Sequence, residues 1–266
     1  MPHRLAHIKH LALDLDGTLY LGGTLFEFTR PFLSLIKTLG IGRTFFTNNS
    51  SRSTKQYVEK LNELGIDASA DDIYSSTHCT LEYLREHHGD AKRAFILGTP
   101  ALREEFREHG FVEDDRDPNL VLVGFDTTLT YDRVCRAAWW ISKGKPFIAT
   151  HPDRVCPTDE PTLLPDCGSI CKLLTHATGR EPDALLGKPD PRMLQGVMQQ
   201  HNLQPQELAV VGDRIYTDMA MARAAGAVGV LVLTGETARQ QADSADPPPD
   251  LIVANVGELG ELLKLR

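Results

Sequence analysis

The feature that most constrains the fold is an apolar run that ends in two carboxylates, Leu-Ala-Leu-Asp-Leu-Asp-Gly-Thr-Leu at residues 11–19. Its short, nearly continuous apolar character is typical of a strand buried on both faces of a parallel sheet. Gly17 permits the chain to turn sharply where that strand ends. Because ligands bind outside the carboxyl ends of strands in open α/β sheets, the pattern predicts Asp14 and Asp16 at the mouth of a site.

Two carboxylates at this spacing repel each other unless a cation lies near them. Magnesium is suited to the position, because it is a hard cation that takes carboxylate, carbonyl and phosphate oxygens. A strand followed by an Asx turn, with both aspartates solvated, produces the same short pattern. The choice between these interpretations therefore depends on the rest of the chain.

The next segments repeat the same strand-and-polar-cluster arrangement. We expect a loop or small hairpin over 20–28, a helix over 31–39 and a strand over 42–46, which ends in the polar cluster Thr47-Asn48-Asn49-Ser50. Ser53 and Gln56 fit a capping box at the start of a further helix. Alternation of strands and helices predicts a parallel sheet.

The middle of the chain has a similar rhythm and forms a candidate second unit over 79–183. Its expected helices cover 81–88, 131–143 and 169–178, and its expected strands cover 94–98, 120–125 and 147–150. A proline-rich loop is expected over 151–166, and Trp139 and Trp140 are expected in the core.

After a short strand over 184–186, the last third returns to the first pattern. The expected elements are a strand over 208–211, a helix from Thr217 to Ala225, a strand over 228–233, a surface loop over 236–250, a strand over 251–253 and a helix over 256–265. The predicted domains are therefore a core formed by 1–78 and 184–266, and an insertion formed by 79–183.

Composition restricts the partners and the compartment. A net charge of -8 argues against polymeric nucleic acid, which requires basic surfaces, but not against a small phosphorylated molecule. The 5 cysteines are scattered and odd in number, so a disulfide framework is not expected. Cys167 and Cys171 could face each other on one helical turn, but they lack further ligands at metal-binding spacing. Without a membrane span or signal-peptide pattern, we expect a cytoplasmic protein.

Polar residues follow four of the predicted strands, and together they form one chemically coherent set. They are Asp14 and Asp16, then Thr47 and Asn48, then Lys188, and finally Asp213 with Asp218. Three carboxylates can organise a magnesium ion, and a lysine with two hydrogen-bonding side chains can hold phosphoryl oxygens. One carboxylate then remains available for nucleophilic attack.

These motifs, in this order, resemble those of the haloacid dehalogenase superfamily. Asp14 to Thr18 matches its first motif, Thr47 its second, Lys188 its third, and the segment from Gly212 to Asp218 its fourth. The resemblance implies an α/β fold: a Rossmann-like parallel-sheet core with a second, inserted α/β cap domain that covers residues 79–183.

The middle segment resembles the cap of subclass IIA, the branch of NagD-like, para-nitrophenylphosphatase and nucleotide phosphatases. The matching residues are Val123-Gly124-Phe125-Asp126, Thr130-Tyr131, Ala149-Thr150, Asp153, Pro157, Gly168-Ser169-Ile170, Gly187-Lys188-Pro189 and Pro191. His151 departs from the branch, in which Asn usually follows the Ala-Thr pair. This departure concerns the choice of substrate and not the chemistry.

The resemblance implies a magnesium-dependent phosphatase of small phosphomonoesters, such as sugar phosphates, nucleoside monophosphates, phosphoglycolate or para-nitrophenyl phosphate. Asp14 would attack phosphorus to form an aspartyl-phosphate, and Asp16 would act as general acid and then general base. Lys188, Thr47 and Asn48 would hold the phosphoryl group. The metal would be held by Asp14, Asp16 through its backbone carbonyl, Asp213 and Asp218.

The resemblance also assigns the cap loop to substrate recognition, with His151, Asp153, Arg154 and Cys156 as the candidate contacts. An ordinary solvated loop is the alternative for these four residues. The expected partner is a small phosphorylated metabolite, and self-association into a homodimer is carried over from the branch.

Two other functions are compatible with the same motifs. One is a phosphotransferase or mutase, which passes the phosphoryl group to a second substrate instead of water. The other is a catalytically weak regulatory binding protein, against which the intact nucleophile, acid and metal ligands argue. Asp16 separates all of these from a dehalogenase, which needs no leaving-group acid at that position.

Overall fold

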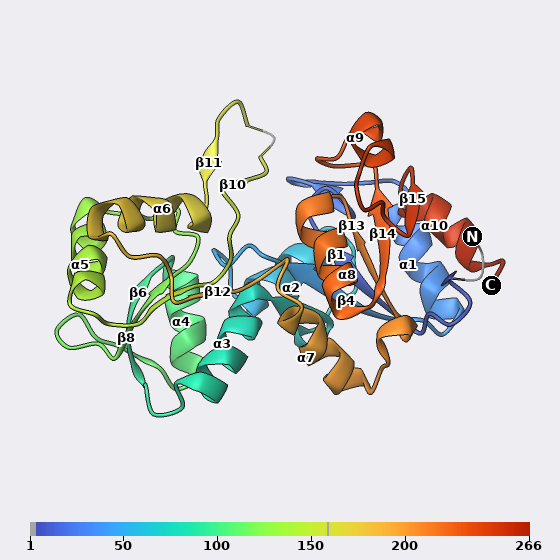
Figure 1. Ribbon diagram of the computed structural model, residues 1–266. Helices are drawn as coiled ribbons and strands as arrows, with labels where there is room; N and C mark the ends of the chain where they lie inside the picture. Colours follow the sequence, from blue (N-terminus) through green and yellow to red (C-terminus); the bar gives the residue numbers. More distant parts are fainter. Residues whose placement is uncertain (1–3, 159) are drawn as a thin grey trace. The chain divides into compact units, whose positions relative to one another are not determined.

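The computed structural model describes residues 4–158 and 160–266, and the chain divides into two compact units. Unit 1 contains residues 1–47, 58–74 and 188–266, and unit 2 contains residues 48–57 and 75–187. Figure 1 shows both units, coloured along the chain. The chain thus leaves unit 1 briefly over 48–57, leaves it again after Tyr74, and returns to it at Lys188.

Unit 1 is organised around a six-stranded sheet with the strand order β15-β14-β13-β1-β4-β5. The strands of this sheet are β1 (His10–Asp14), β4 (Gly42–Thr47), β5 (Ile73–Ser75), β13 (Leu208–Gly212), β14 (Val228–Val232) and β15 (Leu251–Val253). Strand β1 lies centrally and pairs in parallel with β13 on one side and β4 on the other. All five residues of β1 are buried, as its apolar run predicts.

The helices of unit 1 pack beside this sheet. They are α1 (Thr29–Thr38), α2 (Thr54–Glu63), which begins in unit 2, α7 (Arg192–His201), α8 (Ala220–Ala225), α9 (Arg239–Asp243) and α10 (Val256–Leu263). Helix α1 packs against α10, and α8 packs against α7 and β14. A small antiparallel hairpin of β2 (Tyr20–Leu21) and β3 (Thr24–Leu25) follows the first motif, where a loop or hairpin is expected.

Unit 2 contains a second, five-stranded parallel sheet with the strand order β12-β9-β8-β6-β7. Its elements are α3 (Ser76–His87), β6 (Arg93–Leu97), α4 (Pro100–Glu108), β7 (Val112–Glu113), β8 (Leu120–Val123), α5 (Tyr131–Ser142), β9 (Phe147–Ala149), β10 (Val155–Cys156), β11 (Leu164–Pro165), α6 (Cys167–Thr178) and β12 (Ala184–Leu185). The α/β class with two parallel sheets agrees with the prediction.

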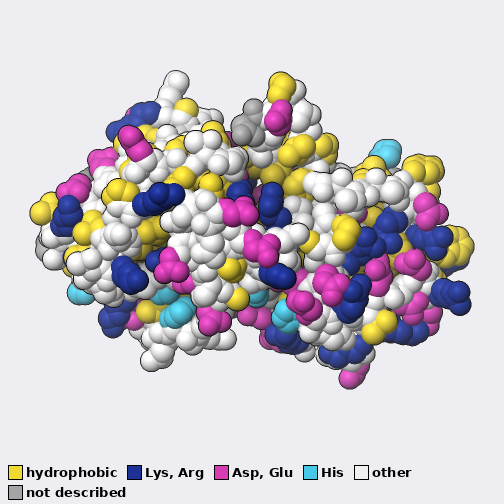
Figure 2. Space-filling view, turned by 180° about the vertical axis from the view of Figure 1, so that it is seen from behind, with side chains coloured by type: hydrophobic (Ala, Val, Ile, Leu, Met, Phe, Trp, Pro, Cys, Tyr) yellow, Lys and Arg dark blue, Asp and Glu magenta, His cyan; other side chains and the backbone are white. Residues whose placement is uncertain are grey.

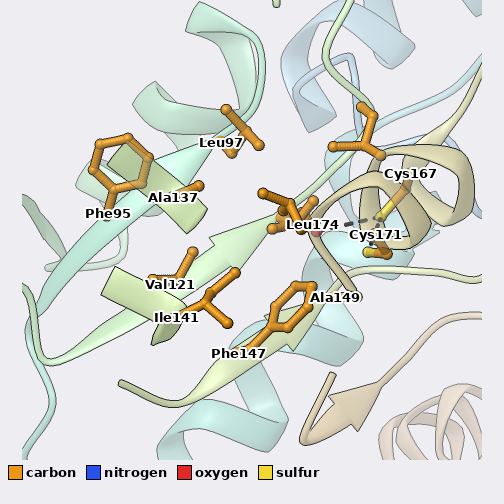
Figure 3. Packing of buried hydrophobic residues seen from close by; sticks show 12 residues of the cluster. Phe95, Leu97, Val121, Ala137, Ile141, Phe147, Ala149, Cys167, Cys171 and Leu174 are labelled. Carbon is orange, nitrogen blue, oxygen red and sulfur yellow. Dashed lines mark hydrogen bonds between the residues drawn. The ribbon is translucent and has the colours of Figure 1, made fainter. Parts of the chain in front are cut away.

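Helices α5 and α6 cover this sheet through an apolar cluster, which Figure 3 shows from close by. The cluster joins β6, β8 and β9 to buried residues such as Ile141 of α5 and Leu174 of α6. The prediction that both tryptophans lie in the core is wrong for Trp139, which is 55% exposed, whereas Trp140 packs against the cluster. Trp139 lies on the outer side of α5, where the ammonium group of Lys143 is 4.3 Å from its ring.

Several element predictions need correction. The expected loop over 236–250 contains the short helix α9, and the expected loop over 151–166 contains the antiparallel hairpin of β10 and β11. Helices α4 and α7 have no counterpart in the sequence prediction. Helix α4 is short and strongly polar apart from Leu102 and Phe106, which are buried. Such a helix is stabilised by its tertiary contacts, and its sequence pattern alone does not predict it.

The segment 48–57 clusters with unit 2, although the sequence-based division assigned it to the core. It bonds to partners elsewhere in unit 2: the Ser50 and Thr150 hydroxyls lie 3.1 Å apart, and the backbone amide of Thr54 donates to the Glu105 carboxylate over 2.8 Å. The predicted limits of the insertion, 79 and 183, lie near the observed changes of unit at Ser75 and Gly187.

The surface carries charges of both signs. Figure 2 shows Lys and Arg interspersed with Asp and Glu over the face in view. Among the residues that the structure describes, no helix is long and apolar enough to cross a membrane.

Candidate active site

Asp14 is the last residue of β1 and lies buried at the carboxyl end of the central strand. The Thr18 hydroxyl donates a hydrogen bond to its Oδ2 over 3.3 Å. Burial raises the pKa of Asp14 to about 7; the carboxylates of Asp218 and Asp213 act in the same direction, and Lys188 acts against them. The position and the surroundings of Asp14 are those expected of a reactive group at a strand end.

Lys188 brings two distant carboxylates together. Its buried ammonium donates to Oδ1 of Asp14 and, over 2.8 Å, to Oδ1 of Asp218. Burial alone lowers the pKa of Lys188, but the two carboxylates outweigh it and hold the pKa above its ordinary value. Lys188 is therefore a fixed positive charge between two anions.

Asp213 follows the end of β13, the strand beside β1. Its Oδ2 accepts a hydrogen bond from the Glu236 amide over 2.6 Å. Its Oδ1 is buried and has no hydrogen-bond partner among the described residues. Burial raises the pKa of Asp213 to about 6, and the nearby charge of Asp218 adds to this effect. An orphaned buried carboxylate oxygen is costly unless a ligand completes it.

Glycines make room for the Asp213 carboxylate. A Cβ at Gly17 would lie 2.6 Å from Oδ2 of Asp213, and a Cβ at Gly235 would lie 2.0 Å from the same atom. Gly17 also has a φ of +85°, which side chains rarely adopt. The glycine of the first motif is thus required by both backbone conformation and space.

Asp218 lies in a widened helical turn, Ile215–Met219, in front of α8. The sequence predicts a regular helix from Thr217, so the wider turn is a correction. It allows Oδ2 of Asp218 to accept a hydrogen bond from the Arg214 amide over 3.2 Å while Oδ1 contacts Lys188. Turns of this kind occur frequently at functional sites.

The remaining predicted core residues take different positions. Thr47 is buried at the end of β4, the other neighbour of β1. Asp16 is half-buried, and its Oδ1 accepts a long hydrogen bond of 3.4 Å from the Gly22 amide of the β2–β3 hairpin. Asn48 belongs to unit 2, where its amide donates to Oδ1 of Asp153 over 3.0 Å.

The predicted cap residues lie on the loop that contains the β10–β11 hairpin. His151 is completely buried, whereas Arg154 is exposed. Cys156 is half-buried, and its sulfur accepts a hydrogen bond of 3.5 Å from the Asn49 amide. The sequence analysis missed Asp166, which bonds to His151 and caps α6. The available signal was weak: Asp166 ends the predicted loop and lies three residues before the predicted helix over 169–178, although aspartate is a favoured N-cap residue.

The core donor set fits a divalent cation. Three carboxylates lie near one another, those of Asp14, Asp213 and Asp218, and the ammonium of Lys188 contacts two of them. Burial, and after it the neighbouring carboxylates, raises the pKa values of Asp14 and Asp213, so the protein alone does not fully stabilise these two anions. Oδ1 of Asp213 provides an acceptor that a hard cation would complete.

Two family models match this chain: a haloacid dehalogenase-like hydrolase model over residues 11–112 and a HAD-hydrolase-like model over residues 185–259. An acid sugar phosphatase of Staphylococcus aureus is 31% identical over 258 residues, which cover 96% of this chain and 98% of that protein.

Two solved structures are similar over nearly the whole chain. The 4-nitrophenylphosphatase of Thermotoga maritima has a TM-score of 0.93 and 40% identity, and covers 97% of this chain and 98% of its own. The glycerol phosphate phosphatase of Mycobacterium tuberculosis in complex with magnesium has a TM-score of 0.90 and 30% identity, and covers 98% of this chain and 79% of its own. This chain belongs to the haloacid dehalogenase-like hydrolases, in the NagD and para-nitrophenylphosphatase branch.

Proposed function

We propose that this protein is a magnesium-dependent phosphatase of small phosphomonoesters. The observation that carries this proposal is the arrangement of Asp14, Lys188, Asp213 and Asp218, in which an orphaned carboxylate oxygen lies beside a lysine-bound nucleophile candidate. The relatives described above act on sugar phosphates, glycerol phosphate and 4-nitrophenyl phosphate. Their shared chemistry is hydrolysis of a phosphate ester, which is the reaction that we assign to this chain.

Asp14 supplies the nucleophile in this proposal. Its carboxylate attacks phosphorus, the ester bond breaks, and an aspartyl-phosphate forms while the alkoxide departs. Lys188 contacts Oδ1 of Asp14, so its charge favours the anionic form of the nucleophile and offsets the approach of two anions. Thr18 holds the other oxygen, which orients the carboxylate.

Asp16 acts as general acid and then as general base. It protonates the departing alkoxide, and then removes a proton from the water that attacks phosphorus and releases Asp14. Its half-buried position two residues after Asp14 leaves the carboxylate accessible for both transfers. Thr47, together with Asn48 and Lys188, is assigned to binding of the phosphoryl oxygens.

Magnesium is assigned to Asp14, the backbone carbonyl of Asp16, Asp213 and Asp218. When bound, the ion supplies positive charge that stabilises the transferring phosphoryl group. Oδ1 of Asp213 is the acceptor that most needs this ion, because it is buried without a protein partner among the described residues. The magnesium in the mycobacterial relative is consistent with this assignment.

Unit 2 is assigned to substrate choice. The exposed side chain of Arg154 is the direct contact that we propose for the substrate's leaving group, with Asp153 and Cys156 nearby on the same loop. Core residues act on the phosphoryl group, which is common to all substrates, and loop residues act on the part that varies. We further propose that the protein forms a homodimer. We also propose a cytoplasmic location, with which the five free thiols among the described residues are compatible.

The test is a screen of sugar phosphates, nucleoside monophosphates, phosphoglycolate, glycerol phosphate and para-nitrophenyl phosphate, with release of inorganic phosphate measured for each. Magnesium-dependent kcat/KM for at least one ester supports the proposal. No release from any ester would contradict it. Phosphoryl transfer to an added alcohol at the expense of release would favour a phosphotransferase instead.

Metal removal provides a separate test with the same substrates. Exhaustive chelation should reduce phosphate release to the background rate, and added magnesium should restore it. The reason is that three carboxylates and one lysine leave excess negative charge where an anionic phosphoryl group must enter. Full activity of the chelated protein would refute the metal assignment.

A further inference from the structure

The loop that contains the β10–β11 hairpin begins and ends at a buried pair of side chains. The chain leaves β9 at Thr150 and enters α6 after Asp166, its N-cap. Nε2 of His151 lies 2.8 Å from Oδ1 of Asp166, and these side chains are 0% and 2% exposed. Nδ1 of His151 lies 2.9 Å from the Thr150 hydroxyl. The imidazole ring therefore has a partner at each nitrogen.

Backbone contacts join the same two ends of the loop. The Asp166 amide donates to the Arg154 carbonyl over 2.9 Å, and the Gly168 amide donates to the Asp153 carbonyl over 2.8 Å. The Ser169 hydroxyl also donates to the Arg154 carbonyl, over 2.6 Å. A Cβ at Gly168 would lie 2.2 Å from the Pro152 carbonyl oxygen, so only glycine allows this approach. The loop is closed at its base.

The base of the loop is in turn anchored to the interior of unit 2. The Thr150 hydroxyl lies 3.1 Å from the Ser50 hydroxyl, which accepts a hydrogen bond from the Phe125 amide over 2.9 Å. Cys167 lies beside Thr150, and its thiol donates to the Val123 carbonyl at the end of β8. Because the base of the loop is bonded to the interior, we expect a change at His151 to shift the hairpin that the base holds.

We propose that the His151–Asp166 pair is a positioning device, which holds the β10–β11 hairpin in the orientation that selects among phosphomonoesters. His151 itself does not contact the substrate, because its ring is buried and engaged at both nitrogens. The selectivity part of this inference rests on the proposed function, whereas the closure of the loop does not. His151 thus acts on substrate choice indirectly, through the hairpin, and not by contact with the substrate.

The electrostatics support a charged pair. Burial alone lowers the pKa of His151, but the carboxylate of Asp166 outweighs it and the pKa rises to about 9, with Cys167 and Asp153 as the other facing groups. At neutral pH both ring nitrogens therefore donate. Because the folded pKa lies above the ordinary value of 6.5, the pair contributes fully below that value and is lost as pH rises through about 9.

A metal ion is the competing use of these side chains. One ligand atom each from His151, Asp153 and Asp166 lies within 4.8 Å of the others. The proton on Nε2 already occupies the position between His151 and Asp166, so the pair is complete without an ion. Added zinc should accordingly leave the melting temperature unchanged in the presence of saturating magnesium, and a marked stabilisation by zinc that D166N abolishes would overturn the proposal.

The first experiment measures selectivity in H151Q, D166N and the double variant. Selectivity is the ratio of kcat/KM for the best metabolite of the screen to that for para-nitrophenyl phosphate. Each single variant should lower this ratio about five- to tenfold, with kcat on para-nitrophenyl phosphate little changed. The double variant can form a neutral amide pair, so its loss should not exceed that of either single variant.

The matched control is E181Q. Glu181, which follows α6, pairs over 2.8 Å with Lys172 of α6, the helix that Asp166 caps. Both side chains of this pair are mostly exposed. Removal of that exposed pair should leave selectivity unchanged. Equal losses on both substrates in H151Q and D166N, or a ratio that does not change in either, would overturn the proposal.

The pH profile of the wild-type ratio separates positioning from simple loss of structure. Titration of the core affects both substrates and cancels in the ratio. The wild-type ratio should fall as pH rises through about 9, the pKa of His151. In D166N the fall should move to lower pH, because the carboxylate that raises this pKa is absent. A ratio independent of pH in the wild type would contradict the proposal.

Hydrogen exchange tests closure of the loop without reference to catalysis. Peptides that cover β10 and β11 should exchange faster in D166N than in the wild type, while those of β1 and β13 should not change. If the wild type hydrolyses no ester, the proposed function fails but this measurement still decides whether the pair closes the loop. Unchanged exchange at β10 and β11 would refute that role. If D166N does not fold, exchange of the wild type measured below and above pH 9 replaces the comparison, and it should become faster at β10 and β11 above that pH.

Discussion

Both units of this protein bury charged side chains, but the two buried groups differ in how far the protein completes them. In unit 1, Lys188 contacts two of the three carboxylates, and an oxygen of the third, Asp213, lacks a partner among the described residues. In unit 2, both ring nitrogens of His151 and Oδ1 of Asp166 have hydrogen-bond partners. The first group needs a ligand, and the second does not.

This difference separates a site of chemistry from a structural contact. Burial of unpaired charge costs free energy, so it persists only where a ligand or a reaction recovers that cost. A complete buried pair instead orders the chain around it. The direction of the pKa changes agrees: the carboxyls of Asp14 and Asp213 are destabilised as anions, whereas the imidazolium of His151 is stabilised.

The largest expected effect concerns the nucleophile of unit 1. D14N should reduce kcat by at least about a thousandfold, because an amide of the same shape cannot attack phosphorus. The melting temperature should change little, since the amide oxygen of the introduced side chain still accepts a hydrogen bond from Thr18. Steady-state kinetics and thermal unfolding measure the two quantities. Retention of a larger fraction of the wild-type rate would remove Asp14 from its assigned role.

A second prediction compares the two units directly through stability without metal. D213N should raise the melting temperature of the chelated protein by about 1–4 °C, because it relieves charge that burial and Asp218 disfavour. D166N should lower it by about 3–8 °C, because it removes the counter-charge that stabilises the buried imidazolium of His151. Calorimetry on both variants measures these shifts.

Opposite signs are the essential outcome of that comparison. A drop in both variants would mean that Asp213 is as well satisfied as Asp166, and the distinction between the two buried groups would disappear. Added magnesium provides the internal control: it should stabilise the wild type and have a much smaller effect on D213N.

The smallest expected effect concerns the surface of the hairpin loop. R154A should lower kcat/KM for the best metabolite up to about tenfold and leave para-nitrophenyl phosphate nearly unchanged. Arg154 is exposed, so its removal should not loosen the loop, which its backbone carbonyl still closes. Kinetics on both substrates, with hydrogen exchange of the β10 peptide, distinguish this direct contact from the positioning effect of D166N.

The sequence alone determined the class of fold and the order of the motifs, and it supplied the candidate site residues of unit 1. The apolar run before Asp14 predicts a buried central strand, and parallel strands place their carboxyl ends at one edge whatever their exact order. Predictions of this kind depend on local pattern and on a rule that all such sheets follow. For the same reason, the small hairpin after Thr18 and the capping box at Ser53 are visible in the sequence and present in the structure.

Only the tertiary structure decided which buried groups are complete. The contact of Lys188 with Asp14 and Asp218, the unpartnered oxygen of Asp213 and the pairing of His151 with Asp166 all join residues from separate elements. The exposure of Trp139, the wider turn before α8 and the membership of 48–57 in unit 2 are decided in the same way. Burial and charge pairing depend on distances across the fold, and spacing along the chain does not encode those distances.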